Sequence, residues 1–276
     1  KEEFIMVVQH NMQAANTNRM LGMNVKAVSK SSEKLSSGYK VNRAADDAAG
    51  LSISEKMRNQ IRGINQAVSN SEDGQYLIQT AEGNMNEIHS ILQRMGELAT
   101  KAANDVNATE DRQSIQDEID QLTSEIDSIS KKAQFNGTYL LSGGMNTGKY
   151  LQVGANKGED MKISIATMNA TKLGVKSLKM SSHGAAGSAM AKITDAIKTV
   201  SKERSKLGAI QNRLDYTINN LQNYSENLTS AESNIRDTDM ATEMVKYSNS
   251  NILAQAGQSM LAQSNQSNQG VLSLLG

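Results

Sequence analysis

The chain has no proline in its 276 residues. An average chain of this length would contain roughly 14. A proline inside a helix removes a backbone hydrogen bond and clashes with the preceding turn, so helices bend or stop there. Long stretches of this chain can therefore remain helical without interruption.

Apolar residues recur at steps of three and four in three long segments. The first runs from Ile78 to Ala99 and the second from Ile115 to Ile129, while leucines occupy every seventh position from Leu207 to Leu228. Heptad spacing of this kind is typical of coiled coils. We predict a mostly α-helical fold, an elongated antiparallel coiled-coil rod whose first long helix covers about residues 64–99.

A few polar positions divide the helical pattern. Gly38 stands where a first helix should end, because glycine readily adopts the left-handed conformation of a helix C-cap. Residues 104–108 form a polar turn, after which Thr109 is expected to cap the next helix. Asn136 and Gly137 together predict a tight turn.

Between residues 142 and 187 the period changes from that of a helix to that of a strand. Leu151 and Val153 alternate with polar residues, and Met161, Ile163 and Ile165 do the same after a turn rich in Gly and Asn. This alternation predicts a small β-hairpin insert. Residues 181–187, rich in Gly, Ala and Ser, are expected to form a flexible bridge to the last helices.

Both ends of the chain are almost free of charge. No Asp, Glu, Lys or Arg occurs in residues 4–18 or 247–276, where Asn, Gln, Ser, Ala and Met dominate. Solvated helices usually carry charges on their outer face, so these ends are either disordered tails or helices that bury themselves against other copies. The C-terminal end has an apolar stripe at helical spacing, which consists of Ile252, Leu253, Ala256, Met260 and Leu261. We predict that the N- and C-terminal ends pair as a terminal helical domain.

Composition excludes several functional classes. The 29 basic and 29 acidic residues balance, which argues against a nucleic-acid-binding protein. The chain has no cysteine for disulfides or thiolate ligands. No segment approaches 18 consecutive apolar residues, so membrane insertion is not expected. The apolar run at residues 4–8 is too short for a cleavable signal peptide.

The sequence offers little that could support catalysis. Its three histidines, His10, His89 and His183, lie far apart, and none belongs to an HExxH motif. No glycine-rich phosphate-binding motif occurs either. We therefore expect no enzymatic activity, no cofactor and no metal site.

Four segments resemble signature segments of bacterial flagellins. They read EKLSSGYKVNRAADDAAGL at residues 33–51, LQRMGELA at 92–99, LGAIQNRL at 207–214 and NLTSAESNIRD at 227–237. The resemblance runs from about residue 6 to 142 and from about 187 to the end, which implies a short flagellin without the large outer variable domains. Residues 1–5 precede the family pattern and are expected to be additional.

The resemblance also implies a domain organisation. Residues 6–45 and 235–276 would form the terminal helical domain, and residues 46–142 and 187–234 the coiled-coil domain. Residues 143–186 would form a β-hairpin and short variable insert that belongs to the coiled-coil domain.

The function implied by the resemblance is structural. The chain would be a subunit of the flagellar filament that self-assembles into a helical extracellular polymer for swimming motility, exported without a cleavable signal peptide. The implied partners are further copies of the chain, the flagellar export chaperone, the cap and hook-junction proteins, and host Toll-like receptor 5. A hook–filament junction protein and a soluble coiled-coil receptor ligand that does not polymerise remain alternatives.

Two groups of candidate contact residues follow from the resemblance. The receptor-binding candidates match the surface that Toll-like receptor 5 grips on other flagellins, and they are Gln93, Arg94, Glu97, Leu98 and Glu118. Leu98 could instead be a core residue, because it flanks the heptad seam. The family's receptor-binding members usually carry arginine at the position of Gly96. This chain lacks that arginine, so any binding of the receptor has to occur without it.

The second group lies near the start of the coiled coil and comprises Arg43, Asp46, Asp47 and Arg58. These residues are either a solvated turn or form ion pairs between subunits. Asp46 and Asp47 can also stabilise the start of a helix. With the C-terminal apolar stripe, they are our candidates for subunit contacts.

Overall fold

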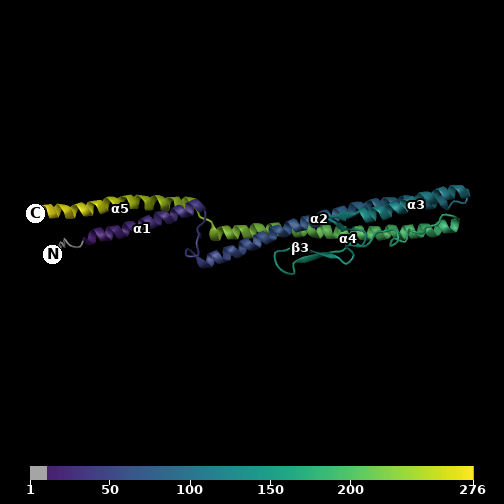
Figure 1. The fold of residues 1–276 in the computed structure, drawn as a ribbon. Helices are drawn as coiled ribbons and strands as arrows, with labels where there is room; N and C mark the ends of the chain where they lie inside the picture. The colour runs from purple at the N-terminus through teal and green to yellow at the C-terminus, as the bar shows by residue number, and fades with distance from the viewer. Residues whose placement is uncertain (1–10, 276) are drawn as a thin grey trace. The chain divides into compact units, whose positions relative to one another are not determined.

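The computed structural model describes the backbone of residues 11–275 and the side chains of residues 11–267. Its elements, in chain order, are α1 (Met12–Ser37), α2 (Ala48–Ala102), α3 (Thr109–Lys132), β1 (Gln134–Phe135), β2 (Thr138–Tyr139), β3 (Lys149–Gln152), β4 (Asp160–Ile163), α4 (His183–Arg236) and α5 (Met240–Leu275) (Figure 1). The predicted mostly helical fold is confirmed. The expected additional residues 1–5 lie outside the described residues.

The chain divides into two compact units. One unit comprises the chain up to Asn59 and from Leu228 onward, and the other comprises Gln60–Asn227. Both α2 and α4 contribute residues to each unit. In the described part of the chain, no helix is both long enough and apolar enough to cross a membrane.

In the unit Gln60–Asn227, the long helices pack in antiparallel directions. Ser225 Oγ of α4 donates to Asn65 Oδ1 of α2 at 2.9 Å, and further along α2 Arg204 Nη2 donates to Glu82 Oε1 at 3.2 Å. Residue numbers therefore increase along α2 in the direction in which they decrease along α4. All seven predicted heptad residues of the segment 78–99 are 0% exposed, which confirms the predicted seam.

Three helix starts differ from the sequence predictions. α2 begins at Ala48 and not near residue 64, because Asp47 Oδ1 accepts a hydrogen bond from the Gly50 amide at 2.8 Å and caps an earlier turn. Thr109 is already the first helical residue of α3, and Asp111 Oδ2 accepts from the amide of Ala108 at 3.1 Å. Thr109 is therefore not the cap.

The expected flexible bridge at residues 181–187 is also wrong, because α4 begins at His183. Ser182 starts this helix: its Oγ accepts from the Ala185 amide at 3.2 Å and its carbonyl accepts from the Ala186 amide at 2.9 Å. The side chains of Ala186 and Ala189 are buried, which holds this first part of the helix against the core.

The described residues contain two hairpins, one within the insert and one just before it. The predicted one is confirmed: β3 and β4 pair antiparallel from Lys149 opposite Ile163 to Gln152 opposite Asp160. The predicted turn at Asn136 and Gly137 has positive φ angles of 45° and 73° and joins the short strands β1 and β2, which the sequence analysis did not foresee.

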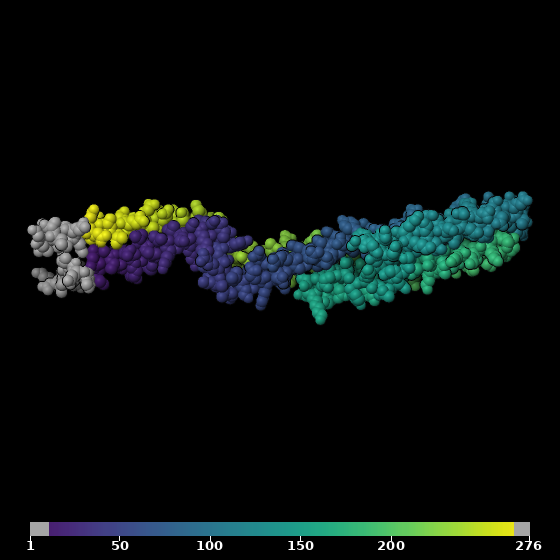
Figure 2. All heavy atoms as spheres, viewed as in Figure 1, coloured from purple at the N-terminus to yellow at the C-terminus, as the bar shows by residue number. Residues whose placement is uncertain are grey.

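The other unit pairs the two terminal helices. Near one end Asn11 Nδ2 donates to the Ser264 carbonyl at 3.3 Å, and near the other Ser31 Oγ donates to Glu243 Oε1 at 2.7 Å, so α1 and α5 are antiparallel. Figure 2 shows the two helices side by side, α1 in purple and α5 in yellow. Gly38 has a φ of 76° and caps the end of α1. The predicted pairing of the chain's ends is confirmed.

Candidate functional site

The seam between α1 and α5 combines small and polar side chains with a few larger apolar ones such as Leu21 and Leu261. On α5 the residues turned toward α1 recur at steps of three and four, and they are Glu243, Tyr247, Ser250, Ala254, Gly257, Leu261 and Ser264. Gly257 lies against α1, because a Cβ there would make an ordinary contact of 3.4 Å with Leu21 Cδ1. Glu243 is 6% exposed, and its hydrogen bond from Ser31 holds the pKa of its carboxyl below the ordinary value.

Larger apolar side chains of this helix pair face away from the seam. Ile252 is 60% exposed, Leu253 54% and Met260 56%, and Ala256 is also exposed. Of the predicted C-terminal stripe, only Leu261 is half-buried against α1. The stripe therefore forms an apolar face that the described part of the chain leaves uncovered. We call Ile252, Leu253, Ala256 and Met260 the outer face of α5.

The connections at the ends of α1 and α4 are tied together. The Thr238 amide donates to the Gly38 carbonyl at 2.9 Å, and the Arg236 guanidinium lies 4.6 Å from the centre of the Tyr39 ring. Ser54 of α2, 1% exposed, donates to Glu232 Oε1 of α4 at 2.7 Å. Sequence reasoning missed these contacts, which join residues far apart in the chain.

The four junction candidates have partners within the chain. Arg43 Nε lies 2.9 Å from Glu33 Oε1, and Asp47 caps α2 as described above. Arg58 Nη1 lies 3.3 Å from Glu55 Oε1, a carboxylate that also pairs with Arg236 at 2.9 Å.

The fourth candidate, Asp46, is the best connected. Its Oδ1 lies 2.8 Å from Lys30 Nζ, and its Oδ2 accepts from the amides of Arg43 at 3.2 Å and Asn42 at 3.3 Å. The hydrogen bond from Lys30, followed by those from the backbone amides, lowers the pKa of Asp46 from 3.8 to about 2.

The lowered pKa of Asp46 makes the fold sensitive to acid. Because the folded-state pKa lies below the unfolded one, this stabilisation is present above pH 3.8 and is lost as the pH falls toward 2. We expect Lys30→Met to raise the pKa of Asp46 toward its ordinary value, measured by NMR titration of the side-chain carboxyl carbon. Lys26→Met, on the same helix without this ion pair, is the control. An unchanged Asp46 pKa in Lys30→Met would contradict the assignment.

Four of the five receptor candidates form a polar surface on α2 and α3. Arg94 Nη2 lies 3.0 Å from Glu118 Oε1, and Nη1 lies 3.1 Å from Glu97 Oε2. Gln93 Nε2 lies 3.2 Å from His89 Nε2. These side chains are exposed, so the surface is open to a partner.

Leu98 differs from the other receptor candidates. It is 3% exposed and belongs to the core, which is the alternative that its position beside the seam suggested. It lines a groove of about 490 Å³ together with Arg94, Glu97 and Glu118. Leu98 therefore supports this surface from within and does not offer its own side chain to a partner.

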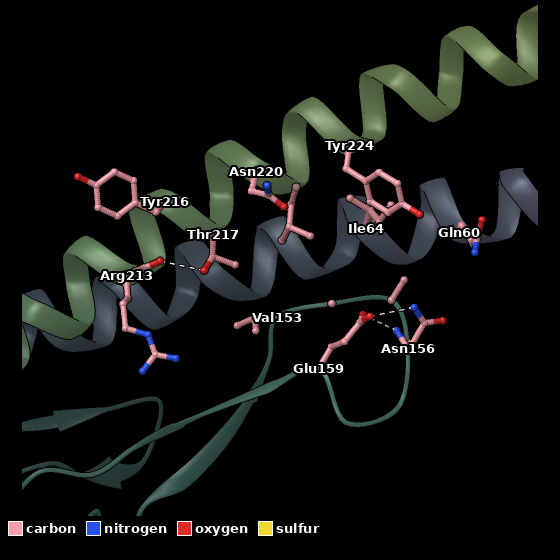
Figure 3. A pocket seen from close by; sticks show the side chains of 13 residues that line it. Gln60, Ile64, Val153, Asn156, Glu159, Arg213, Tyr216, Thr217, Asn220 and Tyr224 are labelled. Atoms are coloured by element: carbon pink, nitrogen blue, oxygen red, sulfur yellow. Dashed lines mark hydrogen bonds between the residues drawn. The ribbon is translucent and has the colours of Figure 1, made fainter.

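A second groove, of about 530 Å³, lies between α2, α4 and the loop that joins β3 to β4 (Figure 3). Arg213, Tyr216 and Tyr224 line it from α4. Across from them, Glu159 accepts hydrogen bonds from the Asn156 amide at 2.9 Å and from Asn156 Nδ2 at 3.0 Å, so its carboxylate is already engaged. The sequence analysis did not identify this groove, whose one signal is the pair of tyrosines on α4.

The described residues contain no cluster of three or more His, Asp or Glu side chains that could hold a metal ion.

Two family models account for most of the chain. The bacterial flagellin N-terminal helical region matches residues 8–147, and the bacterial flagellin C-terminal helical region matches residues 190–275. The chain belongs to the bacterial flagellin family. Flagellin from Halalkalibacterium halodurans is 50% identical over 272 residues, which cover 98% of this chain and all of that protein. Flagellin from Bacillus subtilis is 47% identical over 305 aligned positions, with 98% and 100% of the two chains covered.

A solved structure agrees with this family assignment. Crystalline Bacillus cereus flagellin superposes with a TM-score of 0.50 at 30% identity, covering 55% of this chain and 88% of that one. The predicted resemblance to flagellins is confirmed. The flagellin family consists of structural proteins, so membership also confirms that the chain is not an enzyme.

Proposed function

We propose that this flagellin-family chain is the repeating subunit of a flagellar filament, an extracellular helical polymer that drives swimming. The outer face of α5 carries this proposal, because Ile252, Leu253 and Met260 are more than half exposed on a helix without charge after Lys246. An apolar face on an uncharged helix is stabilised when further copies cover it. Hundreds of identical contacts along a polymer would reinforce one another.

The remaining implied partners belong to the same proposal. Export without a cleavable signal peptide, and contacts with an export chaperone, cap and hook-junction proteins, follow from the family resemblance. The division into a terminal domain of residues 6–45 and 235–276 and a coiled-coil domain of residues 46–142 and 187–234 remains a prediction. Arg43, Asp46, Asp47 and Arg58 remain candidates for subunit contacts, although each already has a partner within the chain.

The hook–filament junction protein is the alternative structural role. Near-complete coverage of relatives named flagellin, at 50% and 47% identity, favours the main filament subunit. A junction protein would not form long filaments on its own, so assembly of the purified chain separates the two.

Assembly is tested by electron microscopy after addition of ammonium sulfate, which strengthens burial of apolar surface. We expect filaments from the intact chain and none from Ile252→Lys with Leu253→Lys, because two charges on the outer face of α5 oppose its burial. Ile252→Leu with Leu253→Ile is the matched control and should form filaments. Circular dichroism should show the same helix content in all three proteins. Normal filaments from the lysine variant would contradict the proposed contact.

We propose a second role as a ligand of host Toll-like receptor 5. The supporting observation is the exposed polar surface in which Arg94 of α2 pairs with Glu97 of the same helix and with Glu118 of α3. Arginine offers several donors in a fixed plane, which suits recognition by a partner's carboxylates or carbonyls. In this chain Gly96 lies beside that surface in place of the arginine that receptor-binding relatives usually carry.

Substitution of Gly96 tests this second role. A Cβ there would lie 3.8 Å from Ile193 Cγ2, an ordinary contact, so a side chain fits. Gly96→Arg should stabilise α2 by about 0.5–1 kcal/mol, measured by thermal unfolding, and increase potency in a receptor-reporter assay. Gly83→Arg, on the same helix with nothing within 4 Å of its Cβ, is the control for charge and helix propensity. Equal potency of the two variants would show that Gly96 does not limit receptor binding.

A further inference from the structure

The methionines of this chain are distributed unevenly between its parts. The described side chains of α1 and α5 include six, which are Met12, Met20, Met23, Met240, Met244 and Met260, and all are between 46% and 74% exposed. The unit Gln60–Asn227 contains another seven. Six of these are at most 5% exposed, and Met190 is packed against the core.

Two of the exposed methionines flank the seam of the terminal helices. Met244 follows the buried Glu243, and Met260 precedes the half-buried Leu261, so both flank the line of contact with α1. Met260 belongs to the outer face of α5. All six thioethers are open to solvent in the single chain, and under the proposed function that of Met260 enters an apolar contact in the polymer.

We propose that these six methionines are sensitive to oxidation, and that hydrogen peroxide blocks assembly by converting them to sulfoxides. The inference rests on the proposed filament function. In each reaction a sulfur lone pair attacks one peroxide oxygen, an S–O bond forms and the O–O bond breaks. Sulfur loses two electrons, and the departing oxygen takes up a proton to leave as water.

Oxidation should block assembly because it makes the methionine side chain polar. A thioether is flexible and apolar and fills irregular contacts well, whereas a sulfoxide is polar and accepts hydrogen bonds. A sulfoxide inside an apolar subunit contact has to give up water without gaining a donor. The buried methionines of the other unit are shielded from the reagent by their packing.

The location of oxidation is tested on the monomer. After brief treatment with hydrogen peroxide and removal of the excess with catalase, peptide mass spectrometry should find sulfoxides at the six positions of α1 and α5. Met85, Met95, Met145 and the other core methionines should stay reduced. Equal oxidation of both sets would overturn the proposal.

The effect on assembly is then measured with ammonium sulfate, as for the untreated chain. We expect the concentration of unassembled chain at equilibrium to rise at least about tenfold after oxidation, with helix content unchanged. Replacing all six exposed methionines by leucine should remove this sensitivity. The matched control replaces six buried methionines by leucine, and its assembly should remain sensitive to hydrogen peroxide. These residues are Met85, Met95, Met145, Met161, Met168 and Met180. Sensitivity that persists in the first variant would overturn the proposal.

If the leucine variant does not assemble even when untreated, a reduction experiment on the native chain tests the proposal instead. Methionine sulfoxide reductases A and B together reduce both sulfoxide epimers, so they should restore assembly of the oxidised native chain. Confirmed reduction without renewed assembly would overturn the proposal. If the untreated native chain forms no filaments, the proposed function itself fails. If it assembles equally well before and after oxidation, only the present inference fails.

Discussion

Deletion of residues 251–276 is expected to leave a folded monomer that forms no filaments. The deletion removes the outer face of α5, and it also removes Ala254, Gly257 and Ser264 from the seam with α1. Docking of a helix that buries a few hundred Å² of apolar area contributes several kcal/mol at about 25 cal/mol per Å², before the cost of ordering. Without that contribution in each subunit, the polymer should not form.

The rest of the chain keeps its own core after this deletion. Leu207 and Leu214 of α4 are 0% exposed and pack in the unit Gln60–Asn227, which the deletion does not touch. Circular dichroism should therefore show that α2, α3 and α4 remain helical, while electron microscopy shows no filaments. As a control, the truncated chain mixed with intact chain should stay out of the polymer. Filaments of normal appearance from the truncated chain alone would exclude the C-terminal helix as the assembly element.

Replacement of Leu92 by alanine should strongly destabilise the monomer. Leu92 is 0% exposed and lies in the middle of the heptad seam of α2, among residues of the continuous core. The substitution removes buried apolar atoms and leaves a cavity, which typically costs about 2–5 kcal/mol. We expect a loss of this size in the free energy of unfolding, measured by denaturation in urea.

The neighbouring residue provides the control. Gln93 is exposed and contacts His89, so Gln93→Ala should change the free energy of unfolding by no more than about 0.5 kcal/mol. Equal effects of the two substitutions would mean that the heptad seam does not carry the stability of this unit.

Patterns within single helices were the most informative part of the sequence. The seven heptad residues from Ile78 to Ala99 are completely buried, because steps of three and four place side chains along one side of a helix whatever the partner is. The β3–β4 hairpin was likewise predicted from the alternation of apolar and polar residues. The start of α2 at Ala48 did not follow from the heptad pattern, although Asp47 was a candidate for stabilising a helix start and does cap α2. The hydrogen bond of Ser54 to Glu232, 178 positions away, has no signal within either helix.

For the candidate contact surfaces too, the sequence does not show which side chains pack against another helix. The sequence identified the stripe from Ile252 to Leu261 as apolar, but not that only Leu261 would meet α1. That outcome depends on packing, because α1 lies on the side of α5 that carries Ala254 and Gly257. The sequence likewise placed Leu98 beside Arg94, and only the packing of α2 on α3 shows that Leu98 lies inside the core.

A cryo-electron microscopy reconstruction of the assembled chain would show whether further copies of the chain cover the outer face of α5. We expect Ile252, Leu253 and Met260, which are 54–60% exposed in the single chain, to be buried in contacts between subunits. A filament in which these three side chains remain exposed to solvent would contradict this expectation, as would the absence of filaments under conditions that assemble a flagellin of known filament-forming ability.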